Sequence, residues 1–158
     1  MKKLITLAVC LIMLFTCAGC GGKAVAAEPA IGDLTALSDI IEGIVADAPD
    51  LPGLMTTELT ADNFTYYTFA TMSDGAEGLV SEPMIGSIPF SAVLVRAADA
   101  DAAAALAKEM EANMDLRKWI CVEAEKGIVT VHGSTVLMVM ASTDAADAIT
   151  ANFDALWA

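Results

Sequence analysis

The sequence predicts an α+β domain of two layers, in which helices pack on a mostly antiparallel sheet. Short apolar runs of strand length alternate with longer stretches whose apolar residues recur at helical spacing. Two of the strand-like runs are separated by only three residues, one of them glycine, which is typical of an antiparallel hairpin. The expected order is a helix and a strand, followed by strand, helix, strand, strand and helix, and it favours this architecture.

In the first half of the chain, a helix is expected from Leu34, because apolar residues recur at helical spacing from there to Val45. Asp33 is in position to cap its N-terminus. Aromatic and β-branched residues fill residues 64–70, which predicts a strand. Glycine and proline repeatedly interrupt residues 73–89, so this segment is expected to be mostly loop with at most one helical turn.

The second half has a clearer pattern. The predicted elements are a strand at 90–97, a helix at 99–114 that Asp99 caps, a hairpin of 128–131 and 135–141, and a helix at 144–156. Thr143 is in position to cap the last helix. Residues 117–126 fit two structures equally well, because their alternation favours a strand and their Glu-Ala-Glu-Lys end favours a helix.

The N-terminus has the layout of an export signal. Lys2 and Lys3 precede an apolar run over residues 4–15, and the small residues Ala18 and Gly19 follow. The run is shorter than the roughly 20 apolar residues that a spanning helix needs. We therefore expect a signal peptide rather than a permanent membrane helix.

Residues 16–20 resemble the lipobox that lipoprotein signal peptidase recognises, with small residues before Cys20 and Cys17 where leucine is usual. This pattern predicts cleavage before Cys20 and attachment of lipid to that cysteine. The chain would then be held at the extracytoplasmic face of the cell membrane. The alternative is ordinary cleavage after Ala26, which would release the protein in soluble form.

Lipoprotein processing would divide the chain into a signal peptide (1–19), the lipidated cysteine with a flexible tether (20–31) and one globular domain (32–158). The 139 residues that remain carry six basic and 21 acidic side chains, a net charge of −15. Such a surface argues against nucleic acid as a partner, because phosphate binding depends on lysine and arginine. Anionic lipid would also repel the domain, so we expect it to stand off the membrane.

Cys121 is the one cysteine left unmodified in this scheme, which excludes an intramolecular disulfide. With His132, the single histidine, it could form a thiol-dependent active site if the two side chains met. However, Cys121 lies in an apolar run where cysteine usually behaves as a small buried residue. His132 precedes Gly133 in the predicted hairpin turn, where it should be exposed. We therefore predict no catalytic residue, no cofactor and, with a single histidine, no multi-histidine metal site.

Two groups of residues are candidate contacts for a ligand or a partner. One is a compact basic and aromatic cluster in a very acidic chain, suited to ion pairing and π contacts. The other is a set of carboxylates in the loop that glycine and proline interrupt. The cluster consists of Arg117, Lys118 and Trp119, and the carboxylates are Asp74, Glu77 and Glu82. The simpler interpretations are cations that follow a helix C-terminus and a solvated acidic loop.

Several segments carry a resemblance to known sequences: the lipobox-like start, residues 77–82, 91–96 and 117–125, and the closing hairpin and helix. On these segments the chain resembles a family of uncharacterised bacterial lipoproteins, found mainly in Gram-positive gut anaerobes and catalogued as a domain of unknown function. The resemblance implies a lipid anchor and a single domain. It implies no activity, because the family has no assigned catalytic residues.

The function expected from the sequence is that of a non-catalytic binding or accessory module, anchored to the membrane, with a protein partner at the cell envelope as its candidate ligand. Two alternatives stay open. One is the extracytoplasmic thiol enzyme that uses Cys121 and His132. The other is a small solute-recognition subunit of an importer, although such proteins usually have two lobes and this chain has residues for one.

Overall fold

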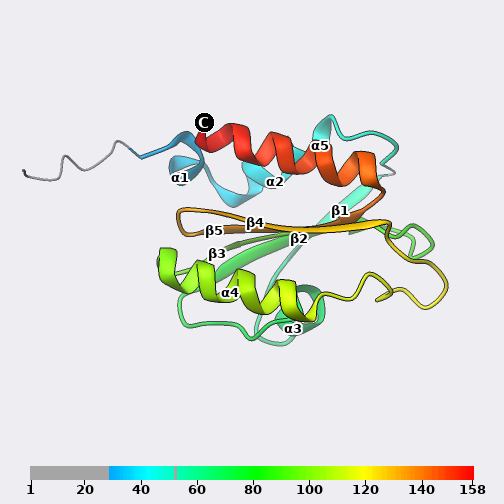
Figure 1. Cartoon of the computed structure of the whole chain (residues 1–158), viewed down its shortest axis with the longest axis horizontal. Helices are drawn as coiled ribbons and strands as arrows, with labels where there is room; N and C mark the ends of the chain where they lie inside the picture. The colour runs from blue at the N-terminus through cyan, green and yellow to red at the C-terminus, as the bar shows by residue number, and fades with distance from the viewer. Residues whose placement is uncertain (1–28, 52) are drawn as a thin grey trace, which may run out of the picture.

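A five-stranded antiparallel sheet runs through the middle of the protein (Figure 1). The structure, a computed structural model, describes residues 29–51 and 53–158. The strands are β1 (Leu54–Glu58), β2 (Glu77–Pro83), β3 (Ser91–Arg96), β4 (Lys126–His132) and β5 (Thr135–Ala141). Their order across the sheet is β1-β2-β3-β5-β4, and each neighbouring pair is antiparallel.

Helices cover both faces of this sheet (Figure 1). One face carries α1 (Ile31–Leu34), α2 (Leu37–Ala46), α5 (Thr143–Asp154) and a final 3-10 turn (Ala155–Trp157), and the other carries α3 (Phe64–Thr68) and α4 (Ala100–Asn113). The α+β class and the antiparallel sheet are confirmed. The layers number three, where two were expected, because the sheet lies between two sets of helices.

The third layer follows from the composition of the two central strands. Every residue of β5 is buried, and so are the first five residues of β3. Because successive side chains of a strand point to opposite faces, a continuous apolar run must be covered on both sides. In β3, Leu94 packs into the core under α2 and α5, and Val93 and Val95 pack into the core under α3 and α4.

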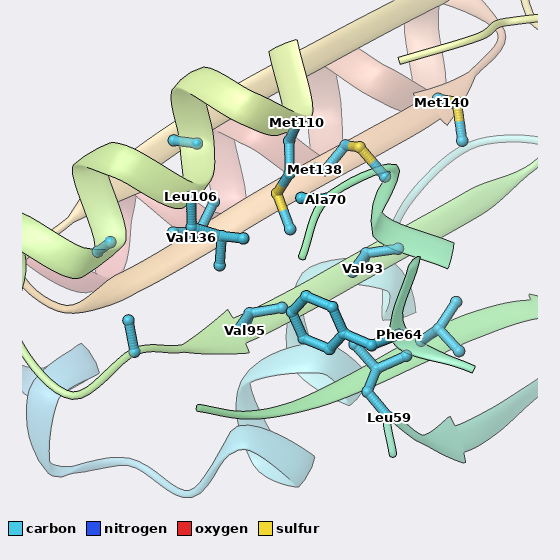
Figure 2. Close-up of a cluster of buried hydrophobic side chains, with 14 of the residues drawn as sticks. Leu59, Phe64, Ala70, Val93, Val95, Leu106, Met110, Val136, Met138 and Met140 are labelled. Carbon is cyan, nitrogen blue, oxygen red and sulfur yellow. The ribbon is translucent and has the colours of Figure 1, made fainter. Parts of the chain in front are cut away.

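Figure 2 shows the core between the sheet and α3 and α4. The ring of Phe64 lies beside Leu59 and Val95, and Met110 of α4 lies near Met138 of β5. Phe64, Met110 and Met138 are all fully buried. This packing fixes α3 and α4 on the sheet.

The strand predicted at residues 64–70 is wrong, because this segment forms α3. Phe64 and Thr68, one helical turn apart, are both buried, and the Thr68 hydroxyl donates a 2.7 Å hydrogen bond to the Phe64 carbonyl. Asn63 stabilises the preceding turn by accepting a 2.7 Å hydrogen bond from the backbone of Thr60. Burial at helical spacing has outweighed the β propensity of the sequence.

The loop predicted at 73–89 is also wrong in part, since it contains β2, and β1 was not predicted. Gly78 lies inside β2 opposite Val95, where an added Cβ would come within 2.8 Å of the Leu94 carbonyl oxygen. The glycine therefore permits a close approach of two strands, and it does not break one. Pro83 is the last residue of β2, where a missing backbone donor costs least.

Four predicted elements are confirmed to within a few residues: the strand at 90–97, the helix at 99–114, the hairpin and the last helix. Asp99 caps α4 as expected, accepting a 2.8 Å hydrogen bond from the backbone of Ala102. Thr143 is the first residue of α5 and not its cap, and its N–H donates to Glu125. Residues 117–125 form neither of the two structures considered, because the chain crosses this stretch as turns and loop.

The expected helix from Leu34 is two helices, α1 and α2. Asp33 lies inside α1, where its carboxylate accepts a 3.0 Å hydrogen bond from the Trp157 indole. α1 is tied to the sheet, because the Arg96 guanidinium donates to the carbonyls of Gly32 and Thr35 at 3.2 and 3.0 Å. Ala30 and Ile31, which were assigned to the tether, therefore belong to the domain as the N-cap and first residue of α1.

The sheet has two ends, which strand register defines. We call the end at which Arg96 of β3 holds α1 the N-terminal end of the sheet, and the β4–β5 turn lies close to it. We call the opposite end the distal end. There β2 finishes, β3 begins, and β4 starts opposite Ala141. Strands of six or seven residues separate the two ends by roughly 20 Å.

The expected signal peptide, Cys20 and most of the expected tether lie outside the described residues. In the described part of the chain, no helix is both long and apolar enough to cross a membrane.

Candidate functional site

Lys118 lies at the distal end, in the segment that links α4 to β4. Only 5% of its side chain is exposed, although the surrounding loop lies at the surface. Its Nζ atom lies 2.7 Å from Oε1 of Glu82, which is 25% exposed and comes from β2. Removing a lysine ammonium from water is costly unless a counter-charge is close, and Glu82 provides it.

Three aromatic rings complete the surroundings of this ammonium. Nζ of Lys118 lies 5.1 Å from the ring centroids of Tyr66 and Tyr67 and 5.3 Å from that of Trp119. These distances are within the range of cation–π attraction. The five residues Lys118, Glu82, Tyr66, Tyr67 and Trp119 are called the lysine cluster below.

The lysine cluster unites residues from both groups that the sequence analysis singled out. Lys118 and Trp119 come from the basic and aromatic cluster, and Glu82 comes from the acidic segment. The tyrosines were not among the candidates, since residues 64–70 were expected to form a strand. A one-turn helix explains their position, because it places both phenol rings over the same lysine.

Burial, followed by the charge of Glu82 and the presence of Tyr66, raises the pKa of the Tyr67 phenol above its usual value of 10.0. The protonated phenol is therefore favoured in the folded state. Its contribution to stability is complete below pH 10 and is lost as the pH rises through the higher folded-state pKa.

We expect Tyr67→Phe to reduce the loss of stability above pH 10, because the variant has no phenol to ionise. Urea unfolding of the wild type and the variant from pH 8 to pH 11 would measure this difference. Tyr66→Phe is the matched control, at a neighbouring phenol that is 63% exposed. Identical pH profiles for the wild type and Tyr67→Phe would contradict the assignment.

The remaining residues of the two predicted groups do not join the site. Arg117 is 76% exposed and reaches only Glu123, at 3.8 Å. Asp74 lies in an exposed turn, and Glu77 begins β2 at the N-terminal end. Glu77 and Glu82 are five residues apart on one strand, so their side chains point to opposite faces. The three carboxylates therefore do not form one acidic site.

Cys121 and His132 are also kept apart. Cys121 is exposed, contrary to the expectation of burial, and lies before β4, whereas His132 is the last residue of β4. The length of that strand, roughly 20 Å, separates them. His132 is only partly exposed: its Nε2 lies 2.8 Å from Asp154, and its ring stacks on Trp157 at 5.2 Å.

Several exposed apolar side chains lie close to the lysine cluster in sequence or across the sheet. Each member belongs to the cluster, lies within three residues of one of its members in sequence, or pairs with Glu82 across the β1–β2 ladder. The members are Met55, Tyr66, Met84, Ile85 and Ile120, each more than half exposed. We call this set the distal patch. Its loops carry no periodic signal, so the sequence analysis did not identify it.

Within residues 29–51 and 53–158, no group of three or more histidine, cysteine, aspartate or glutamate side chains is arranged to hold a metal ion. The site combines a buried cation, aromatic rings and exposed apolar side chains nearby. Such an arrangement suits recognition of another surface by contact.

Comparison with known proteins found no matching family model, curated protein or solved structure.

Proposed function

We propose that the protein is an extracytoplasmic lipoprotein of the uncharacterised family that it resembles, held at the cell membrane by lipid on Cys20. Its domain acts as a non-catalytic binding or accessory module, and the distal patch contacts a protein partner. The observation that carries the binding role is the position of the patch. Its five large apolar side chains are each more than half exposed, and they belong to the end of the sheet opposite the N-terminal attachment.

Physical chemistry supports this use of the patch. Exposed apolar groups are costly when they gather in one area, and such areas mark interaction sites. Met84 and Ile85 are 76% and 60% exposed, and Ile120 is fully exposed. The lysine cluster holds in place the segments that carry these side chains, because Lys118 joins the loop of Ile120 to β2. Segments that are already fixed lose less conformational entropy when a partner binds.

The geometry also fits a membrane anchor. A chain held through residues before α1 would present the N-terminal end to the membrane and the distal patch to the surroundings. The separation of Cys121 and His132 leaves no observation in favour of the thiol-enzyme alternative.

The test is a pull-down from detergent-solubilised envelope with the full-length lipid-bearing chain. We expect the wild type to retain a partner, and the triple variant Met84→Ser, Ile85→Ser, Ile120→Ser to lose it. Ile31→Ser with Leu34→Ser is the matched control, since these side chains are 70% and 74% exposed at the N-terminal end. Equal melting temperatures would show that the variants fold.

Two results would contradict the proposal in different ways. Retention of the same partner by the triple variant, or recovery of the wild type alone, would reject the binding role of the distal patch. Incorporation of labelled lipid into a Cys20→Ala variant would reject the anchor and leave the patch unaffected.

A further inference from the structure

A groove of about 270 Å³ runs between α2 and α5, on the opposite face of the sheet from the lysine cluster. The two helices lie side by side over the sheet in Figure 1. Ile40 and Ile44 close its floor and are each 1% exposed, and Leu156 adds to the apolar lining. Gly43 lines the groove, and a Cβ at this position would lie in open space with no atom within 4 Å.

Asp39 and Asp47 lie at the two ends of this groove, with Gly43 midway between them. The spacing of four residues places all three on one side of α2 and its C-cap, and the Cα atoms of the two aspartates are about 12 Å apart along the helix axis. Both are exposed, and neither takes part in the four ion pairs of the described residues. Asp47 follows the last turn of α2, where the helix dipole disfavours a negative charge.

The neutral polar side chains of the groove have oxygens that can still accept hydrogen bonds. Asn152 donates one of its two amide N–H groups to the Ile44 carbonyl at 3.1 Å, and the Thr35 hydroxyl donates to the Ile31 carbonyl at 2.7 Å. The amide oxygen of Asn152 and the hydroxyl oxygen of Thr35 remain as acceptors. The groove therefore combines an apolar floor with acceptors and two negative charges, which requires a ligand that donates and is positively charged.

We propose that the α2–α5 groove binds an aliphatic polyamine. One ammonium group pairs with Asp39 and another with Asp47, and the methylene chain between them lies along Gly43 and Leu156, which line the groove. A molecule with a single ammonium would leave one carboxylate unpaired. This site is separate from the distal patch, so it does not depend on the function proposed above.

The experiment is calorimetric titration of the full-length chain in detergent with spermidine, at roughly 0.15 M salt, where charges beyond about 8 Å are screened. We expect saturable binding to the wild type, and weaker binding of the monoamine n-butylamine. Asp39→Asn with Asp47→Asn should weaken spermidine binding at least about tenfold, because two charge-assisted hydrogen bonds are lost.

Two further variants separate a built groove from diffuse attraction to an acidic protein. Asp62→Asn with Glu111→Gln removes the same charge from exposed sites away from the groove and should leave the affinity within about twofold. Gly43→Leu keeps both groove carboxylates and fills the space between them, so it should abolish binding. Absence of saturable binding, equal weakening by both charge variants, or full affinity of Gly43→Leu would each overturn the proposal.

Discussion

Replacing Glu82 with alanine should lower the free energy of unfolding by about 3 kcal/mol, because it leaves a buried ammonium without its counter-charge. Lys118 is 5% exposed, and in the structure Glu82 is the carboxylate within ion-pairing distance of it. The cation–π contacts with Tyr66 and Tyr67 remain, but they replace only part of the lost interaction. Urea unfolding monitored by circular dichroism measures the change.

The double variant Glu82→Met, Lys118→Met should be more stable than Glu82→Ala alone, since two apolar side chains in aromatic surroundings bury no charge. Glu123→Ala is the matched control, in the loop that also carries Lys118. Its pair with Arg117 is 3.8 Å long and largely exposed, so we expect a loss below about 1 kcal/mol. A similar small loss for Glu82→Ala would mean that Lys118 reaches water, and the lysine cluster would then be no more than a surface pair.

Phe64→Ala should destabilise the protein by about 3 to 5 kcal/mol, the usual cost of emptying a buried aromatic site. Phe64 is fully buried and joins α3 to the sheet (Figure 2). Its loss should also release Tyr66 and Tyr67 from Lys118, because one short helix carries all three aromatic residues. Thermal and urea unfolding give the first effect, and tyrosine fluorescence reports the second.

Leu34→Ala is the control for this substitution, because Leu34 is apolar but 74% exposed. Its effect should stay within about 0.5 kcal/mol. If both variants lost the same small amount, α3 would not be part of the cooperative core.

The sequence predicted the second half of the fold better than the first, for a physical reason. Residues 99–114 and the hairpin after them have patterns that local contacts explain, such as the Asp99 cap and the turn at Gly133, whose φ is +54°. Residues 64–70 and 73–89 depend on distant contacts. Gly78 fits β2 because Leu94 approaches it, and no local pattern contains that information.

The candidate site shows the same limit. The sequence identified Lys118, Trp119 and Glu82 as candidate binding residues. It did not bring them together, because the bond between Lys118 and Glu82 joins residues that are 36 positions apart. The apolar setting of Cys121 predicted burial, and the cysteine is exposed because its segment forms neither helix nor strand. A continuous apolar run such as β5 did contain a usable signal, since burial on both faces implies a third layer.

The position of β5 has a consequence for the order of folding. It is the last strand in the sequence, yet it lies between β3 and β4 and is the partner of both. Until residues 135–141 are available, β4 has no strand to pair with and β3 is paired on one side only. Completion of the sheet must therefore wait for the C-terminal part of the chain. If the lipoprotein proposed above crosses the membrane as an unfolded chain, this topology delays completion of the rigid sheet until most of the chain has passed through the export channel.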